Sequence, residues 1–206
     1  MKKMTILAVA TLGVTAAIAA GCSQGATPSN TATAGNARPA ANANTTTNAP
    51  PKNADDTPAQ VKAAFADAQS FTTQHKDIPK GQITEIEEQA DGKVPATDHH
   101  SYLAFSTAGG SRKQIGAATV VKAGGKDVVI VYENKDGSPY IKEVRADGVP
   151  APFLAQFAGK GHDDKFLLGA DLKANGVDDA TAKGMVKAIL IDVLTMQALY
   201  GASHSH

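Results

Sequence analysis

This sequence has one cysteine, no tryptophan and no excess of either charge, and these shortages exclude several classes of protein. A single cysteine, Cys22, cannot form a disulfide within the chain. The 20 basic and 20 acidic residues balance, so the basic surface typical of nucleic-acid-binding proteins is missing and we expect no nucleic-acid partner. The sequence also contains no P-loop, no nucleophile elbow and no Ser–His–Asp signature.

The first 21 residues have the composition of an export signal. Residues 1–3 are positively charged, residues 6–18 are apolar, and small residues lead up to Cys22. This arrangement resembles the signal of bacterial lipoproteins. The resemblance implies cleavage before Cys22, a lipid on its thiol, and a location on the extracytoplasmic side of the cell membrane or outer membrane. The alternative is a short transmembrane anchor, but the apolar stretch is shorter than the about 20 residues that span a bilayer.

Residues 22–56 are predicted to form a lipidated, disordered tether. Alanine, asparagine, threonine and proline dominate this segment, and no leucine, isoleucine, valine or aromatic residue occurs between Cys22 and Lys52. Such a stretch cannot bury enough apolar surface to offset the loss of chain entropy on folding. Residues 57–206 then remain as one domain, which is long enough to form a single hydrophobic core.

Hydrophobic periodicity in residues 57–206 predicts helices at both ends and strands between them. A short helix is predicted to end near Ser70 and a second one to cover residues 82–89. Residues 72–79 between them are predicted to form a loop, with a short extended piece as the alternative. An antiparallel sheet of about four strands is predicted from the runs at residues 101–106, 115–121, 128–133 and 140–144. The longest apolar arc starts near Asp178 and predicts a long C-terminal helix. This order predicts an α+β fold with helices covering one face of the sheet.

Several segments of the domain resemble, in order, the FMN-binding domain family. Residues 115–120 (IGAATV) resemble its GKVIGYAVV strand, and residues 129–140 resemble its following hairpin. Residues 153–160 (FLAQFAGK) match its FLxQFxGK motif, and residues 166–171 (FLLGAD) resemble its next step. The resemblance implies an extracytoplasmic electron-transfer domain that carries FMN. A redox partner protein and a flavin transferase would be its partners.

The family attaches FMN through a phosphoester to a threonine in the motif D-x-x-[ST]-G-A-T, at the start of the final helix. Free N–H groups and the helix dipole favour a phosphate there. An alignment without gaps places Asp179 at the modified position, whereas an alignment with two inserted residues places Thr181 there. The helical period favours the first alignment, and the carboxylates of Asp178 and Asp179 repel a phosphate. The covalent-flavin motif is therefore degenerate, and the alternative function is a flavin-free binding or assembly module.

The matched FLxQFxGK segment supplies three further candidates for contacts with FMN. The resemblance implies that Phe153 borders the flavin ring and that Gln156 and Lys160 contact the flavin or its phosphate. The simpler alternatives are a core position for Phe153 and solvated surface positions for Gln156 and Lys160.

Two groups of histidines invite a metal or haem site, Asp98-His99-His100 and His204-Ser205-His206. Neither group has the helical histidine spacing or the cysteine partners of a typical metal site. We therefore predict no metal ligands and no catalytic residues from the sequence.

Overall fold

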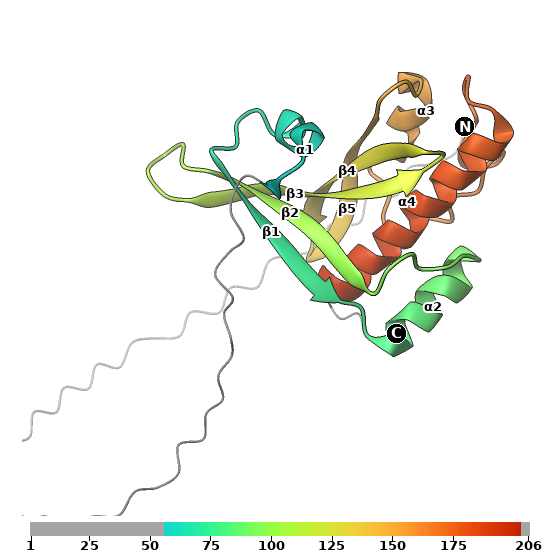
Figure 1. Ribbon diagram of the computed structural model, residues 1–206, viewed down its shortest axis with the longest axis horizontal. Coiled ribbons are helices and arrows are strands. Elements are labelled where there is room, and N and C mark those ends of the chain that lie inside the picture. Colours follow the sequence, from blue (N-terminus) through green and yellow to red (C-terminus); the bar gives the residue numbers. More distant parts are fainter. Residues whose placement is uncertain (1–55, 203–206) are drawn as a thin grey trace, which may run out of the picture. The chain divides into compact units, whose positions relative to one another are not determined.

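The computed structural model describes residues 56–202, which belong to one compact unit of the chain (Figure 1). Cys22, the predicted signal segment and the predicted tether up to residue 55 lie outside the described residues. None of the helices within residues 56–202 is long and apolar enough to cross a membrane.

Residues 56–202 fold into one antiparallel sheet. In the sequence, helices come before the first strand, between the first and second strands, and after the last strand. The sheet contains five strands in the order of the sequence, β1-β2-β3-β4-β5. The α+β class is confirmed, with one strand more than the sequence predicted. The elements are α1 (Ala59–Ala64), β1 (Ser70–Asp77), α2 (Lys80–Ala90), β2 (Asp98–Ser106), β3 (Lys113–Ala123), β4 (Lys126–Lys135), β5 (Ser138–Ala146), α3 (Ala151–Leu154), the 3-10 turn η2 (Ala155–Phe157) and α4 (Asp179–Tyr200).

β1 is the strand that the sequence missed, because residues 72–79 were expected to form a loop. The structure pairs β1 with β2 along its whole length, from Ser70 opposite Phe105 to Asp77 opposite Asp98. No residue of β1 is fully buried. An edge strand of this kind is held by ladder hydrogen bonds on one side, so its side chains need not alternate between apolar and polar.

The main core lies between one face of the sheet and α4, which crosses that face (Figure 1). Met185, Ile189 and Val193 of α4 are fully buried there with Ile130 and Ile141 of the sheet. The opposite face is not bare, because Val61 and Phe65 of the α1 region pack on it in a second cluster with Ala104, Ala118, Val129 and Val131. The expectation that helices cover a single face was therefore wrong.

The ladder between β2 and β3 covers only part of the two strands. It joins residues 102–106 to residues 113–118, so residues 98–101 pair with β1 alone and residues 119–123 pair with β4 alone. A bulge at Ala104 and Phe105 interrupts the β2 register, and bulges bend and twist a strand. Figure 1 shows the two strands diverging where α4 passes behind them.

Candidate functional site

The opening between β2 and β3 is a cleft of about 660 Å³, a size typical of small-molecule sites. One wall comes from β2 and from residues 93–96, which connect α2 to β2. Residues 120–122 of β3 form the other wall, and α4 forms the floor. The cleft exists because the β2–β3 ladder ends before it reaches this region. The sheet therefore leaves one face of α4 uncovered there.

The α4 residues on this floor recur at helical spacing and are mostly small. Gly184, Ala188, Asp192 and Thr195 lie on one face of the helix and line the cleft. A Cβ atom added at Gly184 would meet nothing within 4 Å. Glycine inside a helix costs about 0.5–1 kcal/mol relative to alanine, and no crowding in the fold requires it here. The floor at Gly184 is therefore open space that a ligand can use.

A buried carboxylate closes the inner end of the cleft. Asp192 is 4% exposed, and its side chain accepts three hydrogen bonds. Thr119 Oγ1 on β3 donates to Oδ2 at 2.5 Å, and Tyr132 Oη on β4 donates to the same oxygen at 2.7 Å. Nε2 of His99 on β2 lies 3.1 Å from Oδ1. The hydrogen bonds of Asp192 thus link β2 and β3 in the region where these two strands do not pair with each other.

This network keeps Tyr132 protonated and leaves one nitrogen of His99 without a partner among the described residues. Burial, and next the charge of Asp192, raise the pKa of Tyr132 well above its ordinary value, so the phenol remains a donor. The second ring nitrogen of His99, Nδ1, can also take part in a hydrogen bond. Within residues 56–202 no group hydrogen-bonds this buried Nδ1. An unsatisfied buried polar atom costs about 1–3 kcal/mol, so the cleft wall holds a group that lacks a partner.

Tyr132 also connects the network to a second cavity. This cavity measures about 410 Å³ and includes Leu103, Met196 and Tyr200 in its lining. Ser101 also lines this second cavity, and its Oγ lies 2.9 Å from the hydroxyl of Tyr200. Burial raises the pKa of Tyr200, so it is neutral at physiological pH. The carboxylate of Asp192 therefore has polar contacts that lead toward both cavities.

Three lysines stand at the rim of the cleft, Lys93, Lys122 and Lys187. Lys93 pairs with Glu87 at 2.6 Å, Lys122 pairs with Asp127, and Lys187 donates to the backbone carbonyl of Asp91. The side chains of Lys93 and Lys122 are 87% and 80% exposed. Exposed ion pairs of this kind are weak, so these ammonium groups can turn toward an anionic ligand.

Thr181 and Asp179 lie in the first turn of α4. Asp178 is the N-cap of this helix, and its Oδ1 accepts the N–H of Thr181 at 2.9 Å. Hydrogen bonds from the Thr181 backbone and then from its side chain lower the pKa of Asp178. Asp179 is exposed and is the first helical residue. The position at which a phosphate would bind the helix is thus filled by a carboxylate of the chain itself.

The structure brings the Phe153–Lys160 segment against the loop that leads to Thr181. Gln156 makes this connection, since its side-chain amide accepts the N–H of Lys173 at 2.8 Å and donates to the Lys173 carbonyl at 2.9 Å. Phe153 is fully buried in the main core, with its ring edge-on to Phe157. Lys160 lies 3.6 Å from a carboxylate oxygen of Asp164. Of these described residues, Phe153, Gln156 and Lys160 line neither cavity.

The histidine pair that the sequence singled out is divided between the two faces of the sheet. His99 points to α4 and joins Asp192, whereas Asp98 and His100 point to the opposite face. The sequence patterns did not single out Asp192, Thr119 or Tyr132. A signal existed for Asp192, because it is an acidic residue within the apolar arc of the last helix. No comparable signal marks Thr119 or Tyr132, since both are ordinary strand residues.

Comparisons with family models, with curated proteins and with solved structures gave no match to this chain.

Proposed function

We propose that this domain is an FMN-binding-like electron-transfer domain, tethered outside the cytoplasm through Cys22, with the flavin ring in the cleft between β2 and β3. The observation that carries the proposal is that the cleft lies over the same face of α4 as Thr181, close to the start of this helix. Gly184 lies one turn after Thr181 and lines the cleft. A ligand held near Thr181 by a short flexible chain would therefore reach the cleft.

The residues of the cleft suit a flat ligand that carries a phosphate. Gly184 and Ala188 leave room for a ring against the helix, and Val120 and Val121 supply apolar surface on β3. The lysines of the rim supply positive charge, and a donor that reaches Nδ1 of His99 would satisfy that buried atom. When bound, FMN would supply the uptake and release of electrons. The protein would then hold the ring, keep water from it and present it to a redox partner protein.

The second candidate function is a flavin-free binding or assembly module, and the N-cap of α4 favours it. Asp178 already satisfies the N–H of Thr181 that a phosphate would bind, and Asp179 adds a second negative charge. A phosphoester at Thr181 would have to displace this carboxylate and be held beside it. In this function the same cleft would take a different ligand.

The deciding experiment is the mass and absorbance spectrum of the full chain matured together with a flavin transferase. Covalent carriage adds the mass of FMN at Thr181, and Thr181→Val removes it. Noncovalent carriage leaves the protein mass unchanged and gives a yellow protein that releases FMN on unfolding. A colourless protein of unmodified mass that binds no added FMN would overturn the electron-transfer proposal and leave the binding module.

A pair of neighbouring substitutions tests whether the cleft holds the flavin. Gly184→Leu places a side chain in the cleft, whereas Lys183→Leu changes an exposed residue that does not line it. We expect Gly184→Leu to weaken FMN binding by about tenfold or more, equivalent to about 1.4 kcal/mol, and Lys183→Leu to leave it unchanged. Equal far-UV circular dichroism would show that both variants fold. Unchanged FMN binding in Gly184→Leu would place the flavin elsewhere.

A further inference from the structure

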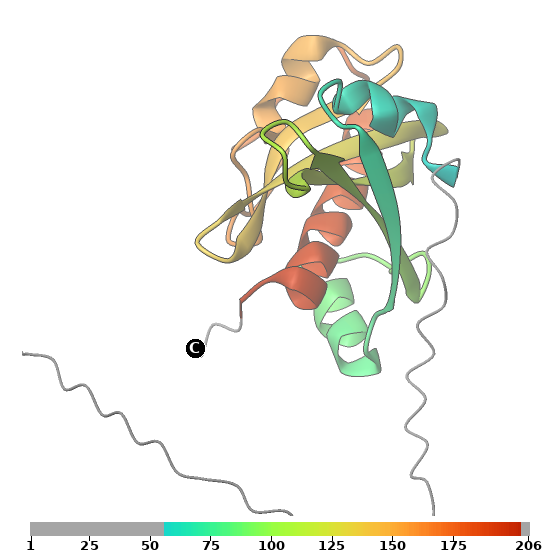
Figure 2. The ribbon, with the colours of Figure 1, turned by 90° about the vertical axis from the view of Figure 1, so that its left-hand side faces the viewer.

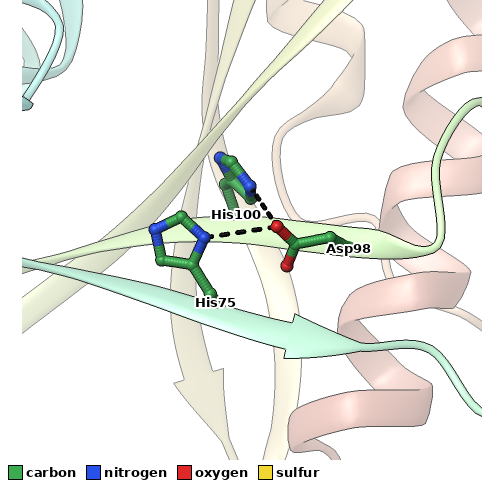
Figure 3. A group of neighbouring side chains, drawn as sticks. All are labelled: His75, Asp98 and His100. Carbon is green, nitrogen blue, oxygen red and sulfur yellow. Dashed lines mark hydrogen bonds and ion pairs between the residues drawn. The ribbon is translucent and has the colours of Figure 1, made fainter. Parts of the chain in front are cut away.

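On the face of the sheet opposite α4, the side chains of two histidines and one aspartate from β1 and β2 lie against one another. His75 of β1 lies directly opposite His100 of β2, and Asp98 precedes His100 by two residues on the same face. The Asp98 Oδ2 atom lies 2.7 Å from His100 Nε2 and 3.3 Å from His75 Nδ1. Figure 3 shows both rings beside the Asp98 carboxylate.

We propose that His75, Asp98 and His100 form a binding site for a divalent transition-metal ion, independent of any flavin. Each residue offers one ligand atom, and these atoms lie within 4.8 Å of one another. Tetrahedral ligands at about 2.0–2.2 Å from a zinc ion are about 3.4 Å apart. The 3.3 Å separation between His75 and Asp98 is close to this value, and the 2.7 Å separation between His100 and Asp98 is shorter, so side-chain rotations that lengthen the second separation would complete the site.

The charge pattern of this face independently favours a cation. Asp77 lies directly opposite Asp98 at the end of the β1–β2 ladder, and like charges in directly opposed positions destabilise a strand pair. Within the described residues, the ion pairs of Asp98 are with the two histidines alone. A bound divalent ion would offset the repulsion between the two aspartates.

The donor set selects the class of ion. Two imidazole nitrogens and one carboxylate oxygen suit zinc or copper, whereas magnesium and calcium prefer oxygen ligands alone. The three side chains are 40–48% exposed, so an ion can enter and water can fill its remaining positions. Asp98 and His100 also line the cleft between β2 and β3. The ion would therefore sit at the rim of the cleft, where a ligand bound in the cleft could approach it.

The test is a calorimetric titration of Zn²⁺ into the flavin-free full chain carrying His204→Ser and His206→Ser, which removes the histidines of the C-terminus. We expect this parent to bind one equivalent of Zn²⁺. His75→Gln and His100→Gln should each weaken binding by about tenfold or more, equivalent to about 1.4 kcal/mol. His162→Gln is the matched control, because it removes a histidine outside the cluster, and it should bind Zn²⁺ as the parent does.

Measurements in a chelator separate loss of binding from loss of folding. Because the cluster is exposed, His75→Gln and His100→Gln should keep the parent's urea midpoint and circular dichroism when no metal is present. The proposal would be overturned by a parent that binds no Zn²⁺, or by cluster variants that bind it as the parent does. Equal weakening by His162→Gln would also overturn it. None of these outcomes depends on whether the chain carries FMN.

Discussion

Removal of the Asp192 carboxylate should be among the most destabilising single changes in this domain. Asp192→Ala deletes the common acceptor of three hydrogen bonds and leaves Thr119, Tyr132 and His99 without it, at a position where Asp192 is only 4% exposed. Hydrogen bonds to charged groups contribute about 1.5–3 kcal/mol each, but contributions within one network are not additive. Each buried donor that is left without its acceptor costs about 1–3 kcal/mol, so we expect a total loss of about 3–5 kcal/mol.

Asp192→Asn should cost less, about 1–3 kcal/mol. The amide oxygen can replace Oδ2 and still accept from Thr119 and Tyr132, because both donors point to that one oxygen. The amide nitrogen would then face His99, which must change tautomer to accept from it. The substitution thus removes the charge and keeps most of the geometry.

The assay is equilibrium unfolding in urea, followed by circular dichroism, with the free energy calculated from the midpoint and the slope. Asp163→Ala is the control, because that side chain is 72% exposed, and its midpoint should not change. Adding Tyr132→Phe to Asp192→Ala should recover part of the loss, since one buried donor fewer is left unsatisfied. A loss below about 1 kcal/mol in Asp192→Ala would refute the inference that this carboxylate holds the two strands on α4.

The raised pKa of Tyr132 means that its contribution to stability is fully present below the unfolded tyrosine pKa of about 10 and is lost as the pH rises above it. Tyr132→Phe should therefore show a smaller fall in urea midpoint between about pH 9 and pH 11 than the wild type. The lowered pKa of Asp178 means that its contribution is present above about pH 4 and is lost at lower pH; Asp178→Ala should lower the midpoint at neutral pH, and the difference from the wild type should close in acid. Cys22→Ser should leave an uncut precursor or release soluble protein, as judged by mass spectrometry and cell fractionation, and a variant that matures and fractionates like the wild type would contradict the lipoprotein prediction.

Local sequence signals determined most of the elements of this fold. The hairpin between β4 and β5 turns at Asp136-Gly137, a dipeptide typical of two-residue turns, and both residues have the positive φ angles that such a turn requires. The wide apolar arc of the last helix was likewise sufficient to predict α4 and its deep packing. These features depend on residues close in the sequence, so the α+β class could be predicted from the sequence.

Only the tertiary structure decided where candidate sites lie, because each depends on partners far apart in the chain. β1 becomes a strand through its pairing with β2, and that pairing alone brings His75 to Asp98 and His100. The cleft depends on where the β2–β3 ladder stops, a property of the register between strands and of no single segment. Asp192 acquires its role because α4 places it under two different strands, 73 residues after Thr119 and 93 after His99. Sequence periodicity reports which face of an element is apolar, but it does not report which element that face meets.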